Sequence, residues 1–124
     1  NGPTMGGLLT IFGFSAFGKH IKNIYPPMVG VILMVLILDL DITIAVTLAI
    51  LFSTALAPVS GEFGVPFGIL AGMVHLPIVL GISQIHGGVL LYANGFAAAF
   101  SAIIIDTIIL SLKRRENQWH FTRK

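Results

Sequence analysis

The sequence predicts an all-α fold, a multi-spanning bundle of transmembrane helices in which some helices are short or broken. Of its 124 residues, 56% are hydrophobic and only 10% are charged, whereas a soluble domain carries about 25% charged residues. The mean hydropathy is +0.96. Glycines, prolines and charges divide the chain into apolar runs of helix length. Because one crossing takes about 20 residues, the chain has room for roughly four or five crossings.

Two parts are expected: a transmembrane helical bundle over residues 1–112 and a basic cytoplasmic tail over residues 113–124. The first apolar, glycine-rich run follows Asn1 without a preceding basic segment, which favours a fragment of a longer chain over a signal peptide. The net charge is +2. The basic residues flank apolar runs as topology signals do, so nucleic acid is not an expected partner. They are Lys19, Lys22, Lys113, Arg114, Arg115, Arg123 and Lys124.

The first half of the chain contains three apolar runs. Residues 4–17 look like the end of a span that begins upstream. Pro26 and Pro27 are expected to open the next helix, since proline suits a first turn whose N–H groups have no helical partner. Residues 26–38 and 42–57 are each shorter than a standard span.

Asp39-Leu40-Asp41 separates these two short runs, and Pro58 is expected to stop the second. We favour two thin crossings joined by an acidic outer loop. The alternative is a re-entrant helical hairpin with Asp39 and Asp41 at its tip, an arrangement that builds ion sites in transporters.

The second half is expected to hold a turn over residues 58–64, a span over residues 65–83 and the longest span over residues 89–112. If the tail is cytoplasmic, counting back through the crossings places the basic connector near Lys19 and Lys22 on the same side. Both basic segments then obey the positive-inside rule.

Two glycine-containing seams are expected to pack against each other across the last two spans. Gly64, Gly68 and Gly72 form a small-xxx-small pattern that His75 continues, and Gly95 begins a similar stripe that ends at Asp106. We therefore expect contact between His75 and Asp106. The pair would titrate protons or orient substrate in a pathway, or would simply form a satisfied hydrogen bond between packed helices.

A second candidate cluster follows the turn. It combines His86-Gly87-Gly88 with Tyr92 and Asn94-Gly95. Glycines permit an unwound helix start whose N–H groups hold an anion or a polar substrate. The structural alternative makes His86 a hydrated loop residue and Asn94-Gly95 a packing notch.

Motifs for catalysis and metal binding are missing from the sequence. No two histidines are four residues apart, and there is no cysteine and no H-E-x-x-H or G-x-S-x-G motif. We expect no enzyme activity, no metal and no cofactor. The expected partners are the lipid bilayer, the remainder of the same polypeptide upstream and a small solute or ion, with a homo-oligomer left open.

Three stretches carry a family resemblance: GFSAFGKHIKNIYPPMVGV, LAPVSGEFGVPFGILAGMVHLPIV and HGGVLLYANGFAAAF. Together they resemble a bacterial family of polytopic membrane proteins of unknown function, over about residues 13–112 and in its C-terminal half. Leu91 and Ala93 stand where more polar residues are expected. The resemblance implies a location in the bacterial inner (plasma) membrane and carries no activity.

The function expected from these features is that of a permease-like small-solute or ion transporter. The alternative is a non-transporting membrane scaffold or assembly subunit. A polar cavity between the last two spans would favour transport, whereas dry packing would favour a scaffold.

Overall fold

The structure is a computed structural model that describes all residues except 1, 17, 19, 86–89 and 123–124. Every regular element in this part of the chain is helical, which confirms the predicted all-α fold with short and broken helices. The elements are α1 (Gly2–Ser15), α2 (Ile21–Ile37), α3 (Ile44–Phe52), the 3₁₀ helix η1 (Ser53–Leu56), α4 (Ala57–Phe63), α5 (Val65–Ile85) and α6 (Leu90–Thr122).

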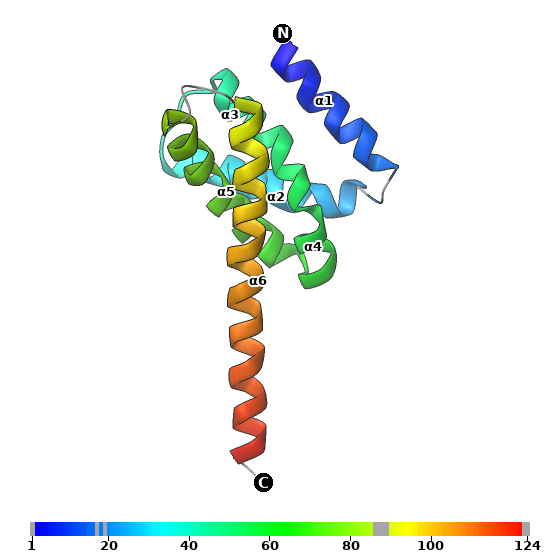
Figure 1. Cartoon of the computed structure of the whole chain (residues 1–124), viewed down its shortest axis with the longest axis vertical. Helices are drawn as coiled ribbons and strands as arrows, with labels where there is room; N and C mark the ends of the chain where they lie inside the picture. The colour runs from blue at the N-terminus through cyan, green and yellow to red at the C-terminus, as the bar shows by residue number, and fades with distance from the viewer. Residues whose placement is uncertain (1, 17, 19, 86–89, 123–124) are drawn as a thin grey trace.

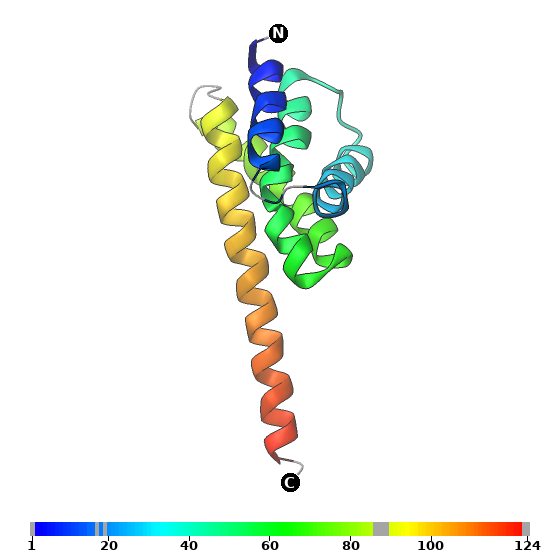
Figure 2. The same cartoon turned by 90° about the vertical axis from the view of Figure 1, so that its right-hand side faces the viewer.

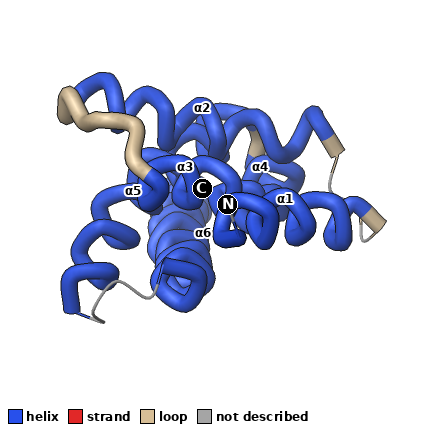
Figure 3. Tube along the Cα trace, turned by 90° about the horizontal axis from the view of Figure 1, so that it is seen from above, coloured by secondary structure: helices blue, strands red, loops and turns tan. Residues whose placement is uncertain are grey.

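The helices form a bundle around the first half of α6, and the second half of α6 extends beyond the others (Figures 1 and 2). α2 lies across α6: it runs from side to side in Figure 1 and is seen nearly end on in Figure 2. From above, α6 is end on while α2 stretches across the molecule (Figure 3). α1 begins and α6 ends at opposite ends of the long axis (Figure 1).

α2 begins at Ile21, so the prediction that Pro26 opens this helix is wrong. The Asn23 side chain accepts a hydrogen bond from the His20 N–H at 2.9 Å, and the Ile24 N–H donates to the His20 carbonyl at 3.1 Å. These bonds form the first turn before the prolines are reached. Pro26 and Pro27 consequently lie inside the helix, where both are buried.

The acidic segment after α2 forms a capped turn. Asp39 has a φ of 51°, the Leu40 N–H donates to the Val35 carbonyl at 3.0 Å, and the Asp39 N–H donates to the Leu36 carbonyl at 3.4 Å. This pair of bonds is a Schellman-type helix end. Asp39 and Asp41 are both exposed in the connection to α3.

α3, η1 and α4 follow one another without a gap and make a candidate span of 20 residues, Ile44–Phe63. The predicted stop at Pro58 and the predicted turn over residues 58–64 are therefore wrong. Pro58 has no N–H to give to the Thr54 carbonyl, which accepts the Ala57 N–H instead. The tighter 3₁₀ turn results, and the helix then continues to Gly64, whose φ is 98°.

The two segments predicted as later spans are helical, in α5 and α6. Within the described residues, three helical units are long and apolar enough to cross a membrane: Ile44–Phe63, Val65–Ile85 and Ala93–Trp119. α2, with 17 residues, is a shorter apolar helix. α6 remains helical through most of the segment predicted as a tail, and the cytoplasmic placement of that segment stays a prediction.

Two apolar clusters form the core. The first joins α2, α3, α5 and α6. The second joins η1, α4, α5 and α6. The first contains Val31, Val35, Val46, Ala49, Leu76, Val79 and Ala97, and the second contains Leu56, Val59, Ala71, Ile105 and Ile109.

Candidate functional site: a buried polar layer around His75

His75 is completely buried, with 0% of its surface exposed. It lies on α5 where the two apolar clusters meet, since Ala71 belongs to one cluster and Leu76 to the other. The Asn94 side chain and the backbones of Ala97 and Ala49 lie beside the ring. α3 and α6 thus enclose the imidazole that α5 presents.

Neither ring nitrogen of His75 has a hydrogen-bond partner in the described part of the chain. The groups beside the ring are near it without reaching hydrogen-bonding geometry. A buried polar group without a partner costs about 1–3 kcal/mol, because it has given up water and gained nothing in exchange. The site therefore holds unused hydrogen-bonding capacity.

Further buried polar side chains lie one helical turn from Ala97 and Ala49, the residues whose backbones flank this ring. Ser101 follows Ala97 by one turn of α6, and Ser53 follows Ala49 by one turn of α3 and η1. Ser101 Oγ donates to the Ala97 carbonyl at 2.7 Å, and Ser53 Oγ donates to the Ile50 carbonyl at 2.6 Å. The polar layer, as we call it, consists of His75, Asn94, Ser53, Thr54 and Ser101, all with 0% exposure.

His75 and Asn94 were predicted from the sequence, whereas the hydroxyl residues of this layer were not. A signal was present in α6, since Ser101 follows Asn94 by seven residues and so falls on the same helix face. Ser53 and Thr54 gave no comparable signal, because their burial depends on η1.

The predicted contact between His75 and Asp106 is wrong. His75 is level with Ala97, and Asp106 comes nine residues later, about 14 Å further along the helix. Asp106 is also exposed, whereas the buried face of α6 carries Ala97 and Ile105. Asp106 remains a separate ionisable group within the candidate span Ala93–Trp119.

The glycine seam of α5 packs against α2 and α4, and so the predicted pairing with α6 is wrong. A Cβ on Gly72 would overlap the Pro27 carbonyl, and a Cβ on Gly68 would overlap the Ser60 hydroxyl. From the other side, a Cβ on Gly30 of α2 would overlap the Ile69 carbonyl. These glycines are required for the close approach of α2 to α5.

The other two predicted packing glycines have different positions. Gly64 ends α4 with a positive φ and is a turn residue. Gly95 is exposed, and a Cβ there would meet no described atom within 4 Å. Neither contributes to a helix contact among the described residues.

The predicted cluster at the turn is only partly described. His86 lies outside the described residues, and so does the Tyr92 side chain, although the Tyr92 backbone belongs to the first turn of α6. Gly87 and Gly88 also lie outside the described residues, whereas Asn94 lies in the polar layer beside His75 and Gly95 is exposed.

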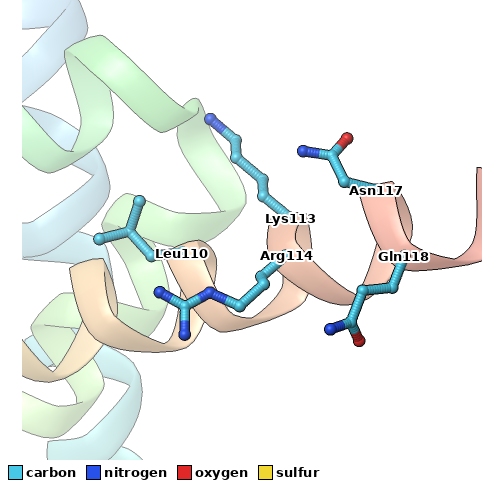
Figure 4. A pocket seen from close by; sticks show the side chains of 5 residues that line it. All are labelled: Leu110, Lys113, Arg114, Asn117 and Gln118. Carbon is cyan, nitrogen blue, oxygen red and sulfur yellow. The ribbon is translucent and has the colours of Figure 1, made fainter. Parts of the chain in front are cut away.

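Two surface depressions lie further along α6. One, of about 290 Å³, lies between α4, the start of α5 and α6, and Glu62, Phe63, Lys113 and Glu116 line part of it. There the Lys113 Nζ is 5.6 Å from the centroid of the Phe63 ring. The other, of about 480 Å³, lies on α6 itself (Figure 4). The described residues include no group of three or more side chains suited to a metal ion.

The described residues together define a helical protein in which three helices are long and apolar enough to span a membrane and buried polar side chains lie among them. Residues 1–111 match the model of a family described as protein of unknown function (DUF1576). The chain belongs to this family, which confirms the predicted membership of a family of unknown function. The comparisons with curated proteins and with solved structures give no match.

Proposed function

We propose that this protein is a permease-like transporter of a small solute or ion, with His75 at the centre of its pathway. One observation carries the proposal: both ring nitrogens of a fully buried histidine lack hydrogen-bond partners among the described residues of a bundle that contains helices of membrane-spanning length. Ionisable groups at such depth are costly, and those that line a pathway repay this cost by binding cargo or protons. The neighbouring Asn94 amide adds a donor and an acceptor to the same place.

The interrupted span supports the same function. Ala49, whose backbone lies beside His75, is followed after one turn by η1. A 3₁₀ stretch in the middle of a helix often marks a hinge, and discontinuous helices commonly form the binding sites of transporters. A change at η1 would therefore alter the surroundings of the His75 ring directly.

Asp106 is the second element of the proposed pathway. It is exposed on α6 less than two turns before Leu112, where the apolar part of this helix ends. A carboxylate at this depth needs a partner or water. We propose that it exchanges protons or cations between the bundle surface and the aqueous side, without enzyme chemistry and without a cofactor.

The scaffold alternative is favoured by the tight packing of Gly30, Gly68 and Gly72 and by the position of the two described depressions, neither of which is lined by His75. Seams of small residues hold membrane helices together in proteins of any function. The two functions differ in what they require of His75: a scaffold gains nothing from an unpaired imidazole, whereas a transporter depends on it.

Flux measurements separate the two functions. The purified protein in proteoliposomes is given a panel of small solutes and ions, with and without a proton gradient, and internal pH and solute uptake are followed. We expect His75→Leu to lower uptake at least tenfold and Gly81→Ala, outside the polar layer, to leave it within about twofold, because a Cβ there would meet no described atom within 4 Å. Equal uptake by His75→Leu and the unaltered protein for every transported solute would remove His75 from the pathway.

A further inference from the structure

The second depression lies on a helix face made of hydrogen-bond donors and a single apolar residue. The donor face, as we call it, consists of Leu110, Lys113, Arg114, Asn117 and Gln118, which surround a depression of about 480 Å³. All five are exposed. In Figure 4, Lys113 and Asn117 extend along one side of α6, whereas the Arg114 side chain turns back toward Leu110.

The charges are sorted by helix face. Successive residues turn by about 100°, so the members of the donor face fall within an arc of about 140°. Glu116 and Arg115 point away from this arc. Glu116 lines the neighbouring groove against α4 together with Glu62 and Lys113, so Lys113 borders both depressions. The donor face therefore carries two cations and two amides but no carboxylate.

This face lies where the apolar part of the helix ends. Lys113 directly follows Leu112, the last residue of the long apolar run. Residues at such a boundary lie at the depth of lipid headgroups. Ile103, which is 63% exposed, lies seven residues before Leu110 on the same side of α6 and continues this face toward the apolar region.

We infer that the donor face binds the phosphate of an anionic phospholipid, with an acyl chain along Leu110 and Ile103. Phosphate oxygens accept charge-assisted hydrogen bonds from lysine and, in bidentate form, from arginine. The amides of Asn117 and Gln118 supply neutral donors beside these cations. A free anion would gain the same hydrogen bonds but nothing from the apolar residues, which is why a lipid fits this face better.

The neighbouring arginines provide a matched test. Arg114 belongs to the donor face, and Arg115 projects from another side of α6 at nearly the same depth. Native mass spectrometry of the purified protein with phosphatidylglycerol and phosphatidylcholine of equal chain length measures which lipid is retained. We expect preferential retention of phosphatidylglycerol, a loss of about fivefold in Arg114→Gln, and a loss below about twofold in Arg115→Gln.

Two further measurements complete the test. Arg114→Lys keeps the charge but not the planar guanidinium, so its retention should lie between those of the unaltered protein and Arg114→Gln. Equal losses in Arg114→Gln and Arg115→Gln, or no loss in either, would overturn the site and leave only diffuse attraction by surface charge. Displacement of phosphatidylglycerol by millimolar inorganic phosphate would overturn the assignment to a lipid.

Discussion

Two successive levels of α5 are built on opposite principles. At the first, the packed level, Gly68 and Gly72 allow the backbone of α2 to approach until a methyl group would no longer fit. At the second, the polar level, His75 lies beside α3 and α6, and its ring nitrogens find no hydrogen-bond partner among the described residues. The packed level maximises contact, and the polar level leaves stabilising interactions unmade.

This difference indicates which level is maintained for stability and which for function. Dispersion contacts and close backbone approach are the main source of helix association in lipid, where helices gain little from the hydrophobic effect. An unpaired imidazole works against stability. Filling a glycine at the packed level should consequently lower stability, whereas replacing His75 by an apolar residue should raise it.

The largest effect on the free energy of unfolding is expected at the packed level, where α5 meets α2. Gly72→Ala places a methyl group against the Pro27 carbonyl of α2, and backbone atoms cannot move aside as a flexible side chain can. Overpacking typically costs 1–3 kcal/mol, so we expect a loss of about 3 kcal/mol or more. Reversible unfolding in mixtures of denaturing and mild detergent, followed by circular dichroism, measures it.

Gly81→Ala on the same helix is the control for this substitution. A Cβ at Gly81 would meet no described atom within 4 Å, and alanine favours the helix by up to about 1 kcal/mol. Equal destabilisation by Gly72→Ala and Gly81→Ala would show that α2 does not approach α5 as described.

The next effect has the opposite sign. Leucine has nearly the volume of histidine and leaves no unpaired nitrogen, so His75→Leu should raise the free energy of unfolding by about 1–2 kcal/mol. The same detergent titration measures this gain. A loss of similar size would indicate that the imidazole is hydrogen-bonded in the native protein. The contrast between the packed level and the polar level of α5 would then disappear.

Ser60 provides a smaller test at the packed level. Its Oγ is buried, has no hydrogen-bond partner among the described residues, and lies where a Cβ on Gly68 would be. Ser60→Ala removes the unpaired hydroxyl, so we expect a gain of about 1 kcal/mol. An unchanged or lower midpoint in the detergent titration would mean that the hydroxyl has a partner or that its volume is needed.

Long apolar runs made part of the fold predictable. α5 and α6 were expected close to where they occur, because each apolar run is long enough to span, and Pro77 lies inside α5 without ending it. The predictions at Pro26 and Pro58 were wrong because the effect of a proline depends on the hydrogen bonds that its neighbours make. Pro26 lies inside α2 since Asn23 organises the turn before it, and Pro58 tightens a helix to 3₁₀ geometry without ending it.

The candidate site was predictable only as a set of residues. Histidine and asparagine in an apolar run are costly, so His75 and Asn94 could be singled out from the sequence. Helical arithmetic shows which residues share a face but not which neighbouring helix covers it. For this reason Gly72 was assigned to a contact with α6, whereas α2 occupies that side.

The smallest effect is expected at Ser101, in the polar layer but with its hydroxyl satisfied. Its Oγ donates to the Ala97 carbonyl within α6, and that carbonyl keeps its helical backbone bond when the hydroxyl is removed. Ser101→Ala should therefore change stability by less than about 0.5 kcal/mol. Combining it with His75→Leu tests whether the layer acts as one network, since independent sites add within about 0.5 kcal/mol. We expect additivity, because His75 makes no hydrogen bond among the described residues through which the two positions could couple. An interaction energy above 1 kcal/mol would place Ser101 and His75 in one hydrogen-bonded unit. That result would contradict the unpaired imidazole.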